Sequence, residues 1–285
     1  MSDGQYLRPE RLEDAVAALR DGAWTLLAGG TDHYPARVTA QRPEDILDIT
    51  GIAGLRGIAD AGDHFRIGAL TRWSDIAECS LPPCFDGLRG AAREVGGAQI
   101  QNRGTIAGNL CNASPAADGV PPLLTLDASV ELASAEGVRG LPLGDFILGN
   151  RQTARRPDEL VTAILVPKPA HPARSTFLKL GARKYLVISI TMVAGLLEVR
   201  DGRVAAARIA VGACSAVAQR LPALEAALEA ALVGQPAGPG LAGLAAPEHL
   251  AGLSPIGDIR ADAGYRQDAA LVLVRRCLKE LGMTA

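Results

Sequence analysis

Aromatic side chains are scarce in this chain, since Phe, Trp and Tyr together make up 4% of the 285 residues, although apolar residues as a whole reach 48%. The core must therefore be built mainly from Ala, Val, Leu and Ile. Charged residues account for 21% and the formal net charge is −2, values close to those of ordinary globular proteins. The basic residues are scattered, so the sequence shows no electrostatic footprint for nucleic acid or an anionic membrane.

Long apolar runs are absent as well. No run approaches the roughly 18 residues that a membrane-spanning helix needs. The first ten residues, MSDGQYLRPE, also lack the apolar core of a signal peptide. We therefore predict a cytoplasmic protein with no membrane span.

Cysteine and histidine are few and are not arranged as ligands. The five cysteines form no CxxC pair, and the four histidines form no HExxH motif. This pattern argues against a disulfide framework and against a zinc or cysteine-ligated iron–sulfur site. We predict no metal site in this chain.

Two common nucleotide-binding signatures are also missing. No GxGxxG motif follows the first predicted strand, and GxxxxGK[ST] does not occur. The sequence therefore supports neither a Rossmann dinucleotide fold nor a P-loop. A diphosphate ligand would have to be held in another way.

Helical and strand-like patterns alternate in the first part of the chain. Leu12, Val16 and Leu19 stand at helical spacing and predict a helix over residues 9–21. Apolar and β-branched segments predict strands, and further helical spacing predicts a helix capped by Thr71. The predicted strands cover 23–28, 46–49, 55–58, 64–70, 129–134 and 159–167, and two more helices cover 85–95 and about 123–128.

A proline-rich stretch, KPAHP at 168–172, separates this part from a second part with a different rhythm. Three strand-like segments follow it, and then come helices near 221–232 and 262–281. We therefore predict an α+β protein with domains at 1–170 and 171–285. The second domain should contain an antiparallel sheet with helices.

The segment LLAGGTD, residues 26–32, ends an apolar strand on two glycines and a hydroxyl. Glycines at such a position let the backbone adopt positive φ and come close to a ligand, so that successive N–H groups form an anion-binding nest. Thr31 adds a hydroxyl donor. An ordinary junction between a strand and a turn is the alternative interpretation.

A second segment rich in small residues runs from Thr105 to Pro122, TIAGNLCNASPAADGVPP, and is predicted to be a loop. Thr105, Asn109, Asn112 and Ser114 offer side-chain donors and acceptors there. The alternative is a helix start capped by Ser114. Asp118 suits the hydroxyls of a ribityl or ribose chain through charge-assisted hydrogen bonds.

These segments resemble those of the FAD-binding medium subunit of the molybdenum hydroxylases, the xanthine dehydrogenase and carbon monoxide dehydrogenase family. LLAGGTDHYP is similar to the family's first FAD loop, and GAQIQNRGTIAGNLCNASPAADGVPPLL is similar to its second. The likeness extends from YLRPERLEDAV through FLKLGARK to IGDIRADAGYR, and so covers nearly the whole chain. It implies a two-part α/β FAD-binding domain of the PCMH type, divided near residues 50–60, and a smaller α+β C-terminal domain.

The resemblance also implies site residues. The first loop would wrap the diphosphate, the second would contact the diphosphate and the ribityl chain, and one carboxylate would bind FAD hydroxyls. The implied FAD-binding residues are Leu26, Leu27, Ala28, Gly29, Gly30, Thr31, Asp32, His33, Val95, Thr105, Ile106, Ala107, Gly108, Asn109, Asp118 and Lys179.

By this resemblance the chain is an electron-transfer flavoprotein subunit of a heteromeric oxidoreductase. Electrons would come from [2Fe–2S] clusters in a small partner subunit, which receive them from a molybdopterin cofactor in a large one. They would leave through FAD to an acceptor such as NAD. The protein supplies position and electrostatics, and the flavin does the redox chemistry.

Two departures from the family pattern leave alternatives open. His33 and Tyr34 stand where the family commonly has aliphatic residues, and Arg183–Val187 replaces a loop that often carries an acidic residue or a tyrosine near the flavin. Tyr185 either stacks on the ring or is an ordinary partly exposed tyrosine. The alternative functions are a self-sufficient FAD oxidase or reductase and a scaffold protein that has lost FAD.

Overall fold

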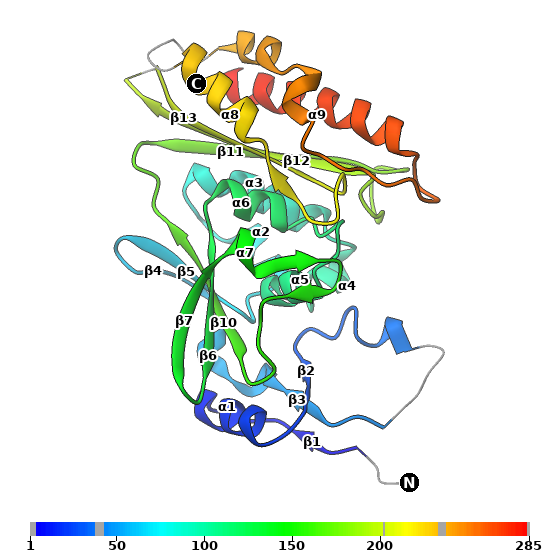
Figure 1. Ribbon diagram of the computed structural model, residues 1–285. Helices are drawn as coiled ribbons and strands as arrows, with labels where there is room; N and C mark the ends of the chain where they lie inside the picture. Colours follow the sequence, from blue (N-terminus) through cyan, green and yellow to red (C-terminus); the bar gives the residue numbers. More distant parts are fainter. Residues whose placement is uncertain (1–3, 38–42, 202, 233–237, 284–285) are drawn as a thin grey trace.

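The computed structural model describes residues 4–37, 43–201, 203–232 and 238–283. Figure 1 shows its elements stacked in layers. At the top, two helices cover a four-stranded sheet; further helices separate this sheet from a five-stranded one. A small parallel sheet and the first helix lie at the bottom, near the N-terminus.

The first layer is built from β1 (Tyr6–Leu7), α1 (Leu12–Asp21), β2 (Thr25–Leu27) and β3 (Ile46–Asp48). The strands are parallel in the order β1-β3-β2. The apolar stripe that predicted the helix is the face it buries, with Ala15, Val16 and Leu19 in a cluster beneath the sheet. This helix is confirmed, beginning at Leu12.

The central sheet is antiparallel and has the strand order β4-β5-β10-β6-β7. Its strands are β4 (Ile58–Asp60), β5 (His64–Gly68), β6 (Ser129–Ser134), β7 (Gly137–Pro142) and β10 (Leu160–Pro167). The strand predicted at 55–58 is wrong in its position, because residues 53–55 form a 3₁₀ turn and β4 begins only at Ile58. No pattern had predicted β7.

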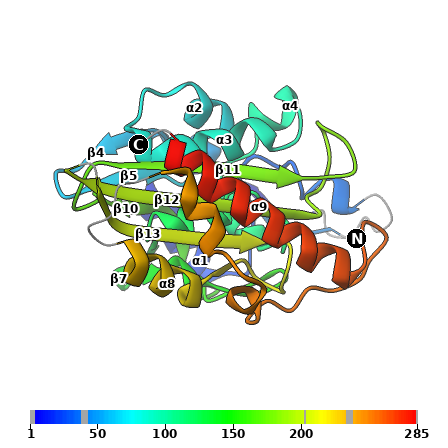
Figure 2. The same ribbon diagram turned by 90° about the horizontal axis from the view of Figure 1, so that it is seen from above.

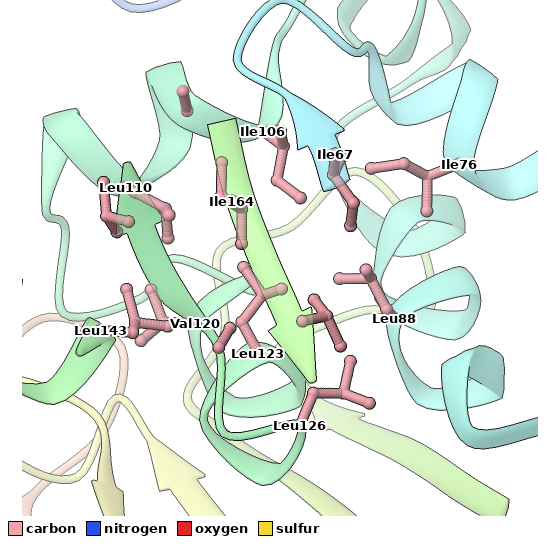
Figure 3. Packing of buried hydrophobic residues seen from close by; sticks show 14 of the residues in the cluster. Ile67, Ile76, Leu88, Ile106, Leu110, Val120, Leu123, Leu126, Leu143 and Ile164 are labelled. Carbon is pink, nitrogen blue, oxygen red and sulfur yellow. The ribbon is translucent and has the colours of Figure 1, made fainter. Parts of the chain in front are cut away.

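Short helices connect β5 to β6 and pack on this sheet. They are α2 (Trp73–Glu78), α3 (Asp86–Glu94), α4 (Ala98–Gln101), α5 (Ile106–Asn112) and α6 (Val120–Thr125), and α7 (Leu143–Phe146) with the hairpin β8 (Ile147–Gly149) and β9 (Gln152–Thr153) follows β7. Figure 3 shows apolar side chains of the helices, among them Leu88 and Leu123, packing against Ile67 of β5 and Ile164 of β10.

Two helix predictions need correction here. The loop expected over 105–122 contains two helices, because Thr105 caps α5 and the chain resumes a helix at Val120. Thr71 does not cap α2: its hydroxyl exchanges hydrogen bonds with the N–H and C=O of Gly57, both at 3.0 Å, and Arg72 is the capping residue.

The C-terminal layer is an antiparallel sheet of β11 (Ala173–Leu180), β12 (Thr191–Arg200), β13 (Arg203–Gly212) and β14 (Gln219–Arg220). α8 (Pro222–Leu232) and α9 (Ala263–Met283) cover its outer face, and Figure 2 shows α9 running obliquely across the strands. The predicted combination of antiparallel sheet and helices is confirmed. Of the helices in the described ranges, none has both the length and the apolar character to cross a membrane.

Candidate functional site

The described structure contains a cavity of about 810 Å³. Four segments far apart in the sequence line it: the loop after β2, the turn after α3, the region of α5, and the end of β11 with the loop that follows. Both parts of the chain therefore contribute to one site.

The loop after β2 brings its backbone unusually close to a neighbouring segment. A Cβ on Gly29 would lie 2.1 Å from the carbonyl oxygen of Arg103, so only glycine fits there. Gly30 has φ +71°, the left-handed region that L-residues with side chains rarely adopt. The predicted positive φ is therefore found at Gly30, whereas Gly29 is required by its close packing against the backbone of Arg103.

The amide groups of this loop are unpaired. Within the described ranges, the backbone N–H groups of Gly29, Gly30, Thr31 and Asp32 donate to no protein acceptor, although all four residues line the cavity. Gly29, Gly30 and Thr31 are half-buried and Asp32 is exposed, so their N–H groups are open to solvent or to a ligand. A run of free N–H groups at a positive-φ glycine has the geometry of an anion-binding nest.

The second segment is arranged differently. The Thr105 hydroxyl accepts from Gly108 N–H at 3.1 Å, and the N–H groups of Ile106 and Ala107 donate to the carbonyl oxygens of Thr71 and Ala69. The amides at the start of α5 are thus already used within the protein.

Ile106 and Ala107 do not line the cavity. Ile106 is fully buried and Figure 3 shows it pointing toward Ile67 and Ile164, while Ala107 is 6% exposed and belongs to the same cluster. Their side chains form the apolar face of α5, in a segment that the sequence predicted to be a loop, and a role for these two residues in cofactor binding stays a prediction.

Asn109 is one of the residues that line the cavity. Its side-chain oxygen is buried and has no hydrogen-bond partner among the described residues. Leaving a buried acceptor unpaired costs about 1–3 kcal/mol. A ligand hydroxyl or N–H group would satisfy it.

Asp118 forms a buried ion pair across the two parts of the chain. Its Oδ2 lies 2.6 Å from Nζ of Lys179 on β11, and its Oδ1 accepts from the Ser189 hydroxyl at 2.5 Å. Nζ also donates to the Glu94 carbonyl oxygen at 3.2 Å. Burial raises the pKa of the Asp118 carboxyl, while the Lys179 ammonium opposes that shift.

Lys179 and Ser189 do not use all the hydrogen-bond acceptor sites of the Asp118 carboxylate. Two oxygens offer about four lone-pair directions, so Asp118 can accept two further hydrogen bonds. The neighbouring pair therefore fixes the carboxylate in orientation and leaves acceptor capacity for hydroxyls.

Ion pairs close the cavity near the first loop. His33 Nε2 and Arg37 Nη1 lie 2.9 and 2.6 Å from Oε1 of Glu44. Arg151, at φ +57°, holds Asp32. His33, which stands where the family commonly has an aliphatic residue, therefore contributes to a polar rim of the cavity. Its ring nitrogen Nε2 faces the Glu44 carboxylate.

Arg151 also donates to the Asn112 side-chain oxygen at 2.6 Å. Its guanidinium thereby ties the first loop, through Asp32, to the last residue of α5. Long-range pairing of this kind has no local sequence signal, and sequence reasoning missed Arg151 for that reason.

Most predicted residues lie on this cavity. Leu26, Leu27, Ala28, Gly29, Gly30, Thr31, Asp32, His33, Val95, Thr105, Gly108, Asn109, Asp118 and Lys179 line it. Tyr185 does not; it is 60% exposed, whereas Leu186, Val187 and Ile188 after it line the wall.

Cys111 is a further wall residue that the sequence did not single out. Burial raises the pKa of its thiol to about 11, so the group is protonated and unreactive at neutral pH. It serves as a small apolar surface.

Comparison with known proteins agrees with this geometry. Residues 2–169 match the model of the FAD binding domain in molybdopterin dehydrogenase, and residues 176–281 match the CO dehydrogenase flavoprotein C-terminal domain. The chain belongs to this family of flavoproteins.

Individual relatives show the same relationship. The chain is 35% identical over 198 residues, 67% of each chain, to a nicotinate dehydrogenase FAD-subunit of Eubacterium barkeri. It is 29% identical to the nicotine 6-hydroxylase medium subunit of Paenarthrobacter nicotinovorans, covering 98% of this chain and 97% of that one. A carbon monoxide dehydrogenase structure from Hydrogenophaga pseudoflava superimposes with a TM-score of 0.85 at 30% identity, covering 99% and 98% of the two chains.

FAD, the cofactor of this family, fits the donor set of the cavity. A nest of free N–H groups suits a diphosphate, and the orphan oxygen of Asn109 and the fixed carboxylate of Asp118 suit hydroxyls. The close backbone approach at Gly29 leaves no room for a side chain between the loop and its neighbour.

Proposed function

We propose that this chain is the FAD-binding electron-transfer subunit of a molybdenum-containing hydroxylase or dehydrogenase. The observation that carries the proposal is the row of N–H groups from Gly29 to Asp32 that have no acceptor among the described residues, on residues that line a cavity of about 810 Å³. FAD supplies the redox chemistry when it is bound.

The chain's own residues would hold and orient the cofactor. Gly29–Asp32 would bind the diphosphate through the backbone, and Asn109 and Asp118 would accept hydrogen bonds from hydroxyls. Lys179 holds the Asp118 carboxyl group in place. Val95, Leu186 and Val187 would exclude water from one side of the bound molecule.

The roles of the two domains and of the partner subunits are proposed by analogy with the family. Residues 1–170 form the FAD-binding domain, divided near 50–60, and residues 171–285 the C-terminal domain, which contributes Lys179. Electrons would arrive from [2Fe–2S] clusters of a small partner subunit, supplied by a molybdopterin-containing large subunit. An acceptor such as NAD, in the cytoplasm, would take them from FAD.

Noncovalent binding of FAD is the first consequence to test. Thr31 stands where covalent relatives of the fold tend to carry histidine, and the nearby His33 faces Glu44 at 2.9 Å. Acid precipitation of the purified protein should release all the yellow colour, and chromatography should identify it as FAD. Colour left in the pellet, or FMN in the supernatant, would contradict the proposal.

The alternative is a self-sufficient FAD oxidase or reductase on the same fold. Native mass spectrometry with metal analysis separates the two. A complex containing iron and molybdenum supports the subunit, whereas a metal-free homo-oligomer that turns over an organic substrate alone supports the oxidase.

A further inference from the structure

Each carboxylate among the described residues that line the cavity faces a basic side chain. The distances between carboxylate oxygen and side-chain nitrogen are 2.9, 2.6 and 2.6 Å for the pairs Asp32–Arg151, Glu44–Arg37 and Asp118–Lys179. With histidine counted as neutral, the acidic charges of the described cavity wall are therefore balanced one for one.

The pair at Asp32 differs from the other two in where its carboxylate stands. Asp32 is the last residue of the loop Gly29–Asp32, and its own N–H is one of the four groups that have no acceptor among the described residues. A negative side chain is thus part of the proposed anion-binding nest. Like charges a few Å apart repel even where water screens them, so a bare carboxylate there opposes the binding of a diphosphate.

Arg151 is held in place from both its backbone and its side chain. It stands in the turn between β8 and β9 at φ +57°, a left-handed conformation that is uncommon for residues other than glycine. Its N–H donates to the Ala113 carbonyl oxygen at 3.1 Å, just beyond the end of α5. Its Nη1 donates to Oδ1 of Asn112 and to Oδ2 of Asp32 at 2.6 and 2.9 Å. The guanidinium therefore meets the Asp32 carboxylate in the structure without any ligand.

Folding stability gives little reason for this pair. The side chains of Arg151 and Asp32 are 60% and 51% exposed, and ion pairs as exposed as this one contribute little to the free energy of unfolding. Removing the pair should leave the fold intact, so its effect on ligand binding can be measured separately.

We propose that Arg151 is a positioning residue for the cofactor, which neutralises and holds the Asp32 carboxylate so that the nest of residues 29–32 can accept a diphosphate. The inference rests on the proposed function. Arg151 acts through Asp32, and the diphosphate itself is bound by the backbone N–H groups of the loop.

A double-mutant cycle on the full chain tests this role. Arg151→Met removes the cation, Asp32→Asn removes the carboxylate, and the double variant removes both. Arg56→Met is the matched control, because the Arg56 guanidinium is 45% exposed and donates to Asp75 at 2.9 and 2.7 Å, away from the residues that line the cavity. FAD is titrated into each purified protein at low and at high salt, and thermal unfolding is followed in parallel.

Arg151→Met should raise the dissociation constant for FAD at least about tenfold at low salt, because the Asp32 charge then faces the diphosphate. The loss should shrink at high salt, since salt screens the repulsion. The double variant should recover most of the lost affinity, and Asp32→Asn alone should bind FAD more tightly than the wild type. Arg151→Lys, which keeps the charge, should stay near the wild type, as should Arg56→Met.

A double variant that binds FAD as weakly as Arg151→Met overturns the proposal, because Arg151 would then act on the cofactor without Asp32. Wild-type affinity in Arg151→Met, or weaker binding in Asp32→Asn than in the wild type, also overturns it. Arg151→Gln repeats the comparison with a neutral side chain that keeps a hydrogen-bond donor, in case the Met variant unfolds. A wild-type chain that binds no FAD contradicts the proposed function itself.

Discussion

Two segments rich in small residues meet at the cavity, yet the structure uses them in opposite ways. In the loop Gly29–Asp32 the backbone N–H groups have no acceptor among the described residues, and the loop lines the cavity. In the segment from Thr105 to Asp118 the backbone is occupied by a helix, and side chains carry the chemistry. Similar composition therefore does not imply a similar binding role.

This difference predicts how each segment fails when it is mutated. Changes in the second segment that remove a charged partner should affect folding as well as binding, whereas changes in the first should act through backbone geometry.

Asp118→Ala should have the largest effect. It leaves the Lys179 ammonium buried without its partner, which costs about 3–5 kcal/mol of folding free energy. It also removes hydrogen bonds to FAD, each worth about 1.5–3 kcal/mol when charge is involved. Denaturant unfolding and FAD titration measure the two effects.

The double variant Asp118→Ala/Lys179→Met separates them. It should recover most of the lost folding free energy, because no buried charge remains, but not the FAD affinity. Recovery of both would remove Asp118 from the list of cofactor contacts.

Gly30→Val should weaken FAD binding strongly with a smaller loss of stability. A β-branched residue resists positive φ, at a cost of about 1–2 kcal/mol, and its Cβ would lie 3.0 Å from the Tyr34 ring, so the loop has to shift. Gly54→Ala is a suitable control, since a Cβ there meets nothing within 4 Å. Equal FAD affinity of the two variants would count against the first loop as a binding element.

Thr105→Ala should have the smallest effect. It removes the hydroxyl that caps α5, worth about 1 kcal/mol of stability, and so shifts the unfolding midpoint. FAD affinity should fall less than in Gly30→Val, because the capping bond is internal to the protein. A loss of affinity larger than that of Gly30→Val would mean that Thr105 binds the cofactor directly.

The sequence predicted those features that local patterns encode. The apolar stripe of α1 and the positive φ of Gly30 were predicted correctly because each has a local physical cause, whereas Gly29 is required by the distant backbone of Arg103. The strand β7 was missed because GVRGLP has no alternating apolar face and is largely exposed.

The features that the sequence did not predict depend on contacts between residues far apart in the chain. Gly108, Asn109 and Asn112 are poor helix formers, and α5 is helical because Ile106 and Leu110 bury an apolar face against the central sheet. The partners of Asp118 come from β11 and the loop after it, more than sixty residues away, so spacing could not reveal them.

A structure of the FAD-loaded protein tests the central claim most directly. The account predicts diphosphate oxygens within about 2.7–3.2 Å of the backbone nitrogens of Gly29–Asp32. Diphosphate bound instead at the start of α5, with these four N–H groups facing solvent, would contradict it.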